Sequence, residues 1–151
     1  MTVHREWRRG EYVLDTDPER LDLTVIHGWL AGPYWSPGMP RATVERAVAI
    51  SLCFGVRRGE AQVGFARVVT DFATFAWVCD VFVLEVERGR GLASWMIECM
   101  RATPELQGLR RWILATRDAH AVYARHGFTS LAAPERWMDV RAPSDLYSRG
   151  T

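Results

Sequence analysis

The sequence contains no lysine and no asparagine, so all 19 of its basic residues are arginine. Without lysine the chain can form neither a pyridoxal-type Schiff base nor a Walker P-loop, whose phosphate contact is a lysine. The 18 acidic residues leave a formal net charge of only +1 at pH 7. Because so balanced a charge creates no overall field that attracts polyanions, we expect no nucleic-acid partner.

Cysteine, histidine and long apolar runs are also scarce. The three cysteines are an odd number without paired spacing, and each lies in an apolar run, which is typical of free, buried thiols. The four histidines form neither an HExxH motif nor a Cys/His finger, so we expect no metal site. No run approaches the roughly 18 apolar residues of a membrane span. We therefore expect a cytoplasmic protein without a membrane partner.

What is present is an ordinary globular composition, with 151 residues of which 48% are hydrophobic. This size favours a single domain over residues 1–151. Periodicity and turn signals predict the order β-α-α-β-β-β-α-β-α-β-β, with the first helix running from Pro18 to Leu30 and two final strands over 128–133 and 136–141. We therefore expect an α+β, or mixed α/β, fold in which about four helices flank a central mixed sheet.

The segment that follows the predicted strand ending at Val83 carries the most chemical information. A polar loop leads into small residues that open a helix, and the amides at a helix start are unpaired and carry partial positive charge. Gly89 and Gly91 would let this backbone approach a phosphate, and Arg88 and Arg90 would add charge. The alternative is an ordinary loop whose glycines only make a turn. The spacing does not fit the G-x-G-x-x-G dinucleotide fingerprint.

Two motifs give the sequence a family resemblance. Arg88-x-x-Gly91-x-Ala93 resembles the (R/Q)-x-x-G-x-(G/A) signature of the GNAT superfamily of acyl-CoA-dependent N-acetyltransferases. The run from Tyr123 to Gly127-Phe128 is similar to the family's Y-x-x-x-G-F helix end, and the element order matches over about residues 11–141. Thr116 stands where the family often has asparagine, which bears on how one side of the pantetheine arm is held.

The resemblance implies an acetyl-CoA cosubstrate, no metal, and a central sheet in which two neighbouring strands splay apart around the pantetheine. The main chain of Val81, Phe82 and Val83 would pair with pantetheine. The backbone that would hold the pyrophosphate is that of Arg88, Gly89, Arg90, Gly91, Leu92, Ala93 and Ser94. A primary amine would then attack the thioester directly, which makes the expected activity that of an N-acetyltransferase.

Two side chains are the catalytic candidates. Tyr123 would protonate the leaving thiolate, since a tyrosine with a pKa near 10 is still protonated at neutral pH. The alternative is a tyrosine that merely packs against Phe128. Asp80 would accept the proton of the amine, because a carboxylate in an apolar strand usually has a partner or a task. Its alternative is a structural ion pair with Arg67, and His120 is a lesser candidate.

The acceptor is the part that the sequence leaves open. Tyr34 and Trp35 lie in the loop where the family builds its acceptor pocket, so we expect them to bind substrate. The amine could belong to a small molecule or a peptide, and a second copy of the chain is a candidate partner. The alternative function is a non-catalytic module that senses acyl-CoA with the same phosphate-binding segment.

Overall fold

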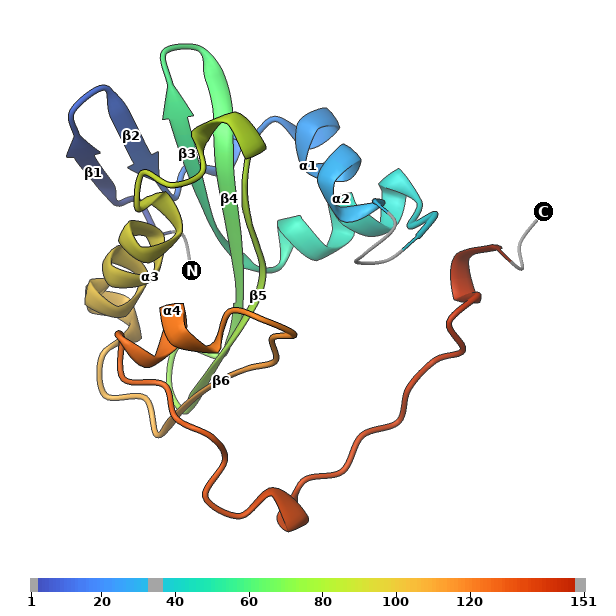
Figure 1. The fold of residues 1–151 in the computed structure, drawn as a ribbon. Coiled ribbons are helices and arrows are strands. Elements are labelled where there is room, and N and C mark those ends of the chain that lie inside the picture. Colours follow the sequence, from blue (N-terminus) through green and yellow to red (C-terminus); the bar gives the residue numbers. More distant parts are fainter. Residues whose placement is uncertain (1–2, 33–36, 149–151) are drawn as a thin grey trace.

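A computed structural model describes residues 3–32 and 37–148 and shows an α+β fold with a mixed sheet (Figure 1). The strands are β1 (Glu6–Arg9), β2 (Tyr12–Asp15), β3 (Leu52–Arg58), β4 (Ala61–Thr70), β5 (Phe75–Val83) and β6 (Arg111–Leu114). The helices are α1 (Leu23–Leu30), α2 (Arg41–Ala49), α3 (Leu92–Ala102) and α4 (His120–Ala124). The predicted fold class is confirmed.

The six strands lie in the sheet in the same order as in the sequence. Successive strands from β1 to β5 are antiparallel, whereas β5 and β6 are parallel because the chain crosses over through α3 between them. Figure 1 shows α3 on one side of the sheet and the α1–α2 pair on the other. This arrangement places the end of β5 and the loop that follows β6 near the start of α3.

Each face of the sheet has its own apolar core. On the first face, α3 buries an apolar stripe at helical spacing: Leu92, Trp95, Met96, Cys99 and Met100. On the second face, α1 and α2 bury Ile26, Leu30, Val44 and Val48 against Cys53 and Phe65. β5 contributes Ala76, Val78 and Val83 to the first core, and Phe82 stacks on Trp29 of α1 on the second face.

The parallel ladder between β5 and β6 is short, and the two strands then separate. It pairs Phe75 with Arg111 and ends where Val78 meets Leu114, whereas β5 continues to Val83. The pairing of β5 with β4 contains a bulge at this point. Arg67 of β4 lies opposite Cys79, whereas the next paired residue of β4, Phe65, lies opposite Phe82, and Asp80 within the bulge has a positive φ of 55°. The predicted splayed strand pair is therefore present.

The first helix begins later than the sequence predicted. Pro18–Arg20 form a separate 3₁₀ turn capped by Asp17, and the α-helix starts at Leu23. Asp22 caps this second start by accepting from the amide of Val25, while its own amide donates to Gln62 Oε1 at 2.7 Å. The prediction of one helix from Pro18 is wrong because a second cap and a tertiary hydrogen bond break it.

The prediction of two final strands, over 128–133 and 136–141, is also wrong. Neither 128–133 nor 136–141 forms a strand, although both have strand-like sequences. After α4 the chain passes β6 and then leaves the body as an extended arm (Figure 1). A strand needs a neighbour to pair with, and within the described chain these two segments have none.

Candidate active site

A cleft opens where β5 and β6 separate. One wall is β5 from Val78 to Val83, and the other is the loop after β6 together with Tyr123 of α4. Arg88 and Ala93 close the end nearest α3. The cleft measures about 700 Å³, which lies in the range of small-molecule sites. It therefore gathers residues from both sequence motifs at one place.

The start of α3 faces this cleft with unsatisfied amides. Its first intrahelical hydrogen bond is donated by Trp95 to Gly91, so the amides of residues 92–94 have no acceptor within the helix. Gly91 occupies the N-cap position without a side-chain cap and has a φ of 76°, which glycine adopts more easily than any other residue. The local geometry is that of an anion-binding helix start.

The two arginines of the motif are held by other groups. Arg88 Nε donates to the carbonyl of Val83 at 3.1 Å, and its backbone amide donates to Glu85. Arg90 Nη1 donates to the hydroxyl of Tyr12 at 2.9 Å and forms an ion pair with Glu87. Both side chains therefore brace the loop between β5 and α3.

The buried carboxylate of Glu87 lies at the centre of these contacts. Its carboxylate accepts a hydrogen bond from the Tyr12 hydroxyl and pairs with Arg58 at 3.1 Å. These two contacts, the tyrosine first, hold the pKa of Glu87 below its usual range. The carboxylate is therefore ionised at neutral pH and ties the loop to β2 and β3.

Asp80 lies in the cleft wall at the bulge of β5. Arg67 Nε donates to Asp80 Oδ2 at 2.6 Å, and each of the two side chains is about one-fifth exposed. Arg67 also donates to the hydroxyl of Ser51 at 3.1 Å. The ion pair that the sequence offered as the alternative to a base role is thus present.

Tyr123 borders the cleft from α4. Burial raises the pKa of its hydroxyl above the usual tyrosine value, so the group is protonated at neutral pH. Its ring meets Phe128 edge-on with centroids 5.8 Å apart. The tyrosine therefore packs against Phe128 and reaches the cleft as well, so the two interpretations of its role are compatible.

The thiol that borders the cleft is a poor nucleophile. Burial raises the pKa of Cys79 to about 11, with a partial offset from Arg67. Because a thiol is nucleophilic only as the thiolate, Cys79 is almost entirely in its unreactive form at neutral pH. A route through an acyl-cysteine has no support at this position.

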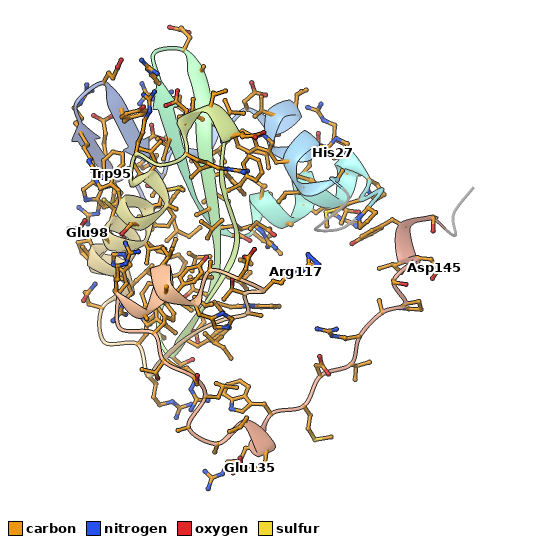
Figure 2. All side chains as sticks on the ribbon, viewed as in Figure 1. His27, Trp95, Glu98, Arg117, Glu135 and Asp145 are labelled. Atoms are coloured by element: carbon orange, nitrogen blue, oxygen red, sulfur yellow. The ribbon has the colours of Figure 1, made fainter. Side chains whose placement is uncertain are left out.

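Several residues of the site escaped the sequence prediction. One of them is His126, whose Nε2 lies 2.7 Å from the hydroxyl of the predicted residue Ser94 and so ties the first turn of α3 to the segment that follows α4. A basic groove next to Gly91 is lined by Arg8, Arg9, Ser94, Trp95, Glu98 and Arg125; Figure 2 labels Trp95 and Glu98 on its α3 side. The only sequence signal for this groove was the short arginine run before Gly10.

Two further residues border the cleft beyond β6. Thr116, at the position where asparagine is common in similar proteins, accepts a hydrogen bond from the amide of Ala119 at 3.1 Å and so shapes the entry to α4. Arg117 follows it, and Figure 2 shows its side chain reaching out from this loop. The predicted acceptor residues Tyr34 and Trp35 lie outside the described residues.

Within 3–32 and 37–148, no helix is long and apolar enough to cross a membrane. No group of three or more histidine, cysteine or acidic side chains in these residues is arranged to hold a metal ion.

Comparison with known proteins agrees with this geometry. The family described as acetyltransferase (GNAT) domain matches residues 49–130. A protein of Gibberella zeae, named provisionally as an acetyltransferase, is 29% identical, and the match covers 83% of each chain. A GNAT-family crystal structure from Xanthomonas campestris pv. campestris is 46% identical, with a TM-score of 0.87 over 91% of this chain and 96% of that one.

A more distant solved structure bears on the fold. A protein of Clostridium acetobutylicum, crystallised with acetyl-CoA, has a TM-score of 0.65 at 13% identity, over 86% of this chain and 94% of that one. The family match and the Xanthomonas relative confirm the resemblance that the two motifs indicated. The chain belongs to the GNAT family of acetyltransferases and is an acyltransferase.

Proposed function

We propose that this protein transfers the acetyl group of acetyl-CoA to a primary amine by direct attack of the amine on the thioester. The observation that carries the proposal is the divergence of β5 from β6 beside the uncapped start of α3. GNAT enzymes use acetyl-CoA, and the Clostridium structure of the same fold contains it.

The pantetheine arm would lie along β5 where β6 no longer pairs with it. The main chain of Val81, Phe82 and Val83 would supply the hydrogen bonds that a neighbouring strand would otherwise make. The amides from Gly89 to Ser94 would bind the pyrophosphate at the start of α3. The basic groove formed by Arg8, Arg9 and Arg125 would place positive charge near the nucleotide end.

The chemical step needs one attack and one proton donation. The amine nitrogen forms a bond to the thioester carbon, and the carbon–sulfur bond breaks as the tetrahedral intermediate collapses. A backbone amide near Val83 would stabilise the oxyanion, and Tyr123 would give its proton to the departing thiolate. The proton that the amine loses would pass to solvent at the cleft mouth, and the loop with Tyr34 and Trp35 would line the acceptor site.

We propose a positioning role for Asp80 at the bulge, and the ion pair with Arg67 supports this role. Asp80 Oδ2 is engaged by Arg67 Nε at 2.6 Å, and the pair would fix the backbone where β5 turns away from β6. We expect Asp80→Asn to lower kcat by the same factor at neutral and alkaline pH, and to lower the free energy of unfolding by about 1–3 kcal/mol.

The pH profile separates this role from general-base catalysis. A general base is needed less at high pH, where the amine is already deprotonated. If Asp80 were a base, the kcat of Asp80→Asn would therefore approach that of the parent protein at high pH. Arg67→Gln is the matched variant, because it breaks the same ion pair and keeps the carboxylate. Equal losses in the two variants support positioning; a loss confined to Asp80→Asn that disappears at high pH would contradict it.

The proposal itself is tested by binding and turnover of the unmodified protein. Calorimetry with acetyl-CoA should show one site per chain. Thiol release should then identify the acceptor from a panel of polyamines, amino acids, aminoglycosides and peptides. Absence of binding at about 1 mM acetyl-CoA, the upper end of ordinary KM values, would refute the proposal.

A further inference from the structure

A hydrogen bond joins the side chains of Ser94 and His126 beside the start of α3. Ser94 Oγ lies 2.7 Å from His126 Nε2, and both side chains are half-buried. Ser94 also lines the basic groove next to Gly91, and its amide is one of the three that have no acceptor within α3. The hydroxyl therefore lies in the first turn of the helix whose start we propose as the pyrophosphate site.

The backbone that carries His126 is held by a turn at the end of α4. The amide of His126 donates to the carbonyl of Tyr123 at 2.9 Å, and the amide of Phe128 donates to the same carbonyl at 3.3 Å. Between them Gly127 has a φ of 92°, which lets the chain reverse after the helix. The position of the imidazole relative to α3 is therefore set by this turn as well as by the bond to Ser94.

The direction of the bond decides what Ser94 can offer a ligand. A serine hydroxyl carries one proton, so it donates one hydrogen bond at a time. When His126 Nε2 lacks a proton, it accepts from Ser94, and the hydroxyl has no proton left for a phosphate oxygen. When Nε2 carries a proton, as it does in one neutral tautomer and always in the imidazolium, it donates to Ser94 Oγ. The hydroxyl proton is then free for an anion.

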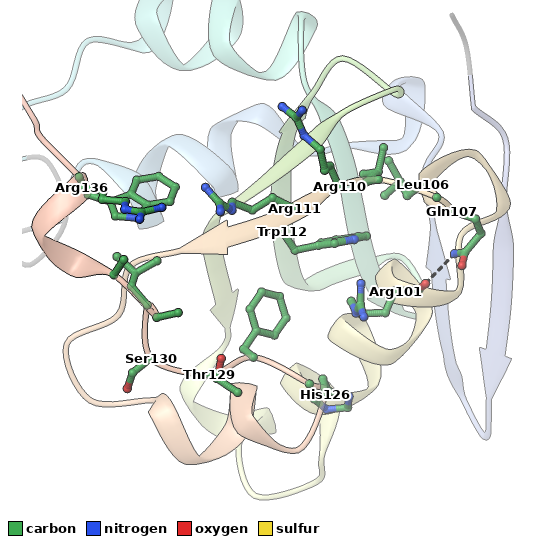
Figure 3. A pocket seen from close by; sticks show the side chains of 18 residues that line it. Arg101, Leu106, Gln107, Arg110, Arg111, Trp112, His126, Thr129, Ser130 and Arg136 are labelled. Carbon is green, nitrogen blue, oxygen red and sulfur yellow. Dashed lines mark hydrogen bonds between the residues drawn. The ribbon is translucent and has the colours of Figure 1, made fainter.

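Charged side chains surround this pair on several elements. His126 lines a groove of about 920 Å³ between β6 and residues 128–131, and Figure 3 shows Arg101 of α3 at the same end of it. The basic groove on the other side of Ser94 contains Glu98 of α3. The other charged residues that line the two grooves are all arginines: Arg8, Arg9, Arg110, Arg111, Arg125 and Arg136. Arginine keeps its charge across the pH range of enzymes, and burial raises the pKa of Tyr123, so neither masks the titration of an imidazole.

We propose that His126 is a positioning residue for the cosubstrate and that its protonation frees the Ser94 hydroxyl to donate to the pyrophosphate of CoA. This role rests on the proposed function, because it takes the start of α3 as the pyrophosphate site. The imidazolium holds Ser94 Oγ as an acceptor and leaves its proton to the ligand. By linkage, bound CoA favours the protonated ring by the same factor by which protonation raises the affinity for CoA.

The role predicts a pH dependence of CoA affinity with a definite sign. Histidine is the side chain that loses its charge between about pH 5 and pH 8, so the affinity should fall as the pH rises. His126→Gln is the informative variant, because an amide nitrogen in the place of Nε2 donates to Ser94 at every pH. We expect the Kd of the parent protein divided by that of His126→Gln to rise about fivefold from about pH 5.5 to about pH 8.5, the difference between a charged and a neutral donor.

Calorimetry with CoA measures this ratio. The phosphomonoester of CoA itself titrates near pH 6, and its contribution cancels because both proteins bind the same ligand. In the Ser94→Ala background, the corresponding ratio should stay constant within about twofold, the scatter expected for positions that do not interact. His4→Gln removes an exposed histidine just before β1 and is the matched control, which should keep the pH dependence of the parent protein.

Three results would overturn the role of His126. The first is a Kd ratio that does not change with pH. The second is an equal rise of the ratio in the Ser94→Ala background, since His126 would then act on the ligand without the serine. The third is loss of the pH dependence in His4→Gln as well. A parent protein that binds no CoA at about 1 mM would refute the proposed function itself and this role with it, so the two failures are distinguishable.

Discussion

Replacing Tyr123 with phenylalanine should lower kcat for acyl transfer by roughly 10²–10⁴-fold, the usual contribution of a positioned general acid. Phenylalanine keeps the ring and its edge-on contact with Phe128, whose centroid lies 5.8 Å away, and removes only the hydroxyl. Acetyl-CoA affinity should be nearly unchanged, because the proton is needed only when the thiolate leaves. The loss should therefore appear in kcat and not in KM.

Steady-state kinetics of the two proteins, with any acceptor found in the thiol-release screen, measures this effect. Tyr147→Phe is the matched control, because it removes a hydroxyl from the distal arm and should leave kcat unchanged. A phenylalanine variant that turns over like the parent would remove Tyr123 from the mechanism and leave it as a packing residue.

The pH dependence offers a second readout for the same residue. The acid must be protonated to act, and burial raises the pKa of Tyr123. Since the group loses its proton only above the usual tyrosine range near pH 10, activity should not decline between neutral pH and about pH 9 on its account. A fall in kcat that begins near neutral pH and disappears in Tyr123→Phe would contradict the raised pKa of Tyr123.

Replacing Gly91 with valine should weaken CoA binding by about 10²-fold or more. Gly91 has a φ of 76° at the start of α3, and a β-branched residue is strongly disfavoured there. The loop should shift to relieve the strain and turn the amides of residues 92–94 away from the cleft. Each amide–phosphate hydrogen bond contributes about 1.5–3 kcal/mol, so loss of two accounts for the expected factor.

Calorimetry with CoA measures the loss, and circular dichroism checks that the variant is folded. Gly59→Val is the matched control, because Gly59 has a φ of 61° with open space around it in the β3–β4 turn. It imposes similar backbone strain far from α3 and should leave the affinity unchanged. If Gly91→Val bound CoA like the parent, the start of α3 would not be the phosphate site.

The sequence by itself determined the features that rest on local patterns. The apolar stripe of α3 repeats at helical spacing, and the helix is where that stripe predicts it. The two motifs identified the family because each is a short run with its chemistry in the side chains or backbone of consecutive residues. The strand that ends at Val83 and the loop to Gly91 follow from the same local signals.

Only the tertiary structure decided what depends on residues far apart in the chain. The choice of partner for Asp80 required the register that brings Arg67 opposite the bulge. The contact between Ser94 and His126 and the basic groove with Arg8 join segments that no spacing rule connects. The start of α1 at Leu23, and not at Pro18, likewise depended on the hydrogen bond that the amide of Asp22 donates to Gln62.

The arm shows the same division most clearly. Residues 136–141 have the alternation of a strand, and that alternation reports a face that prefers burial. It does not report which backbone will pair with it, because strand pairing is a non-local contact whose partner can come from the same chain or from another. In this structure residues 137–141 form no strand, so the sequence specified the alternation and the tertiary structure decided that the segment stays unpaired within the described chain.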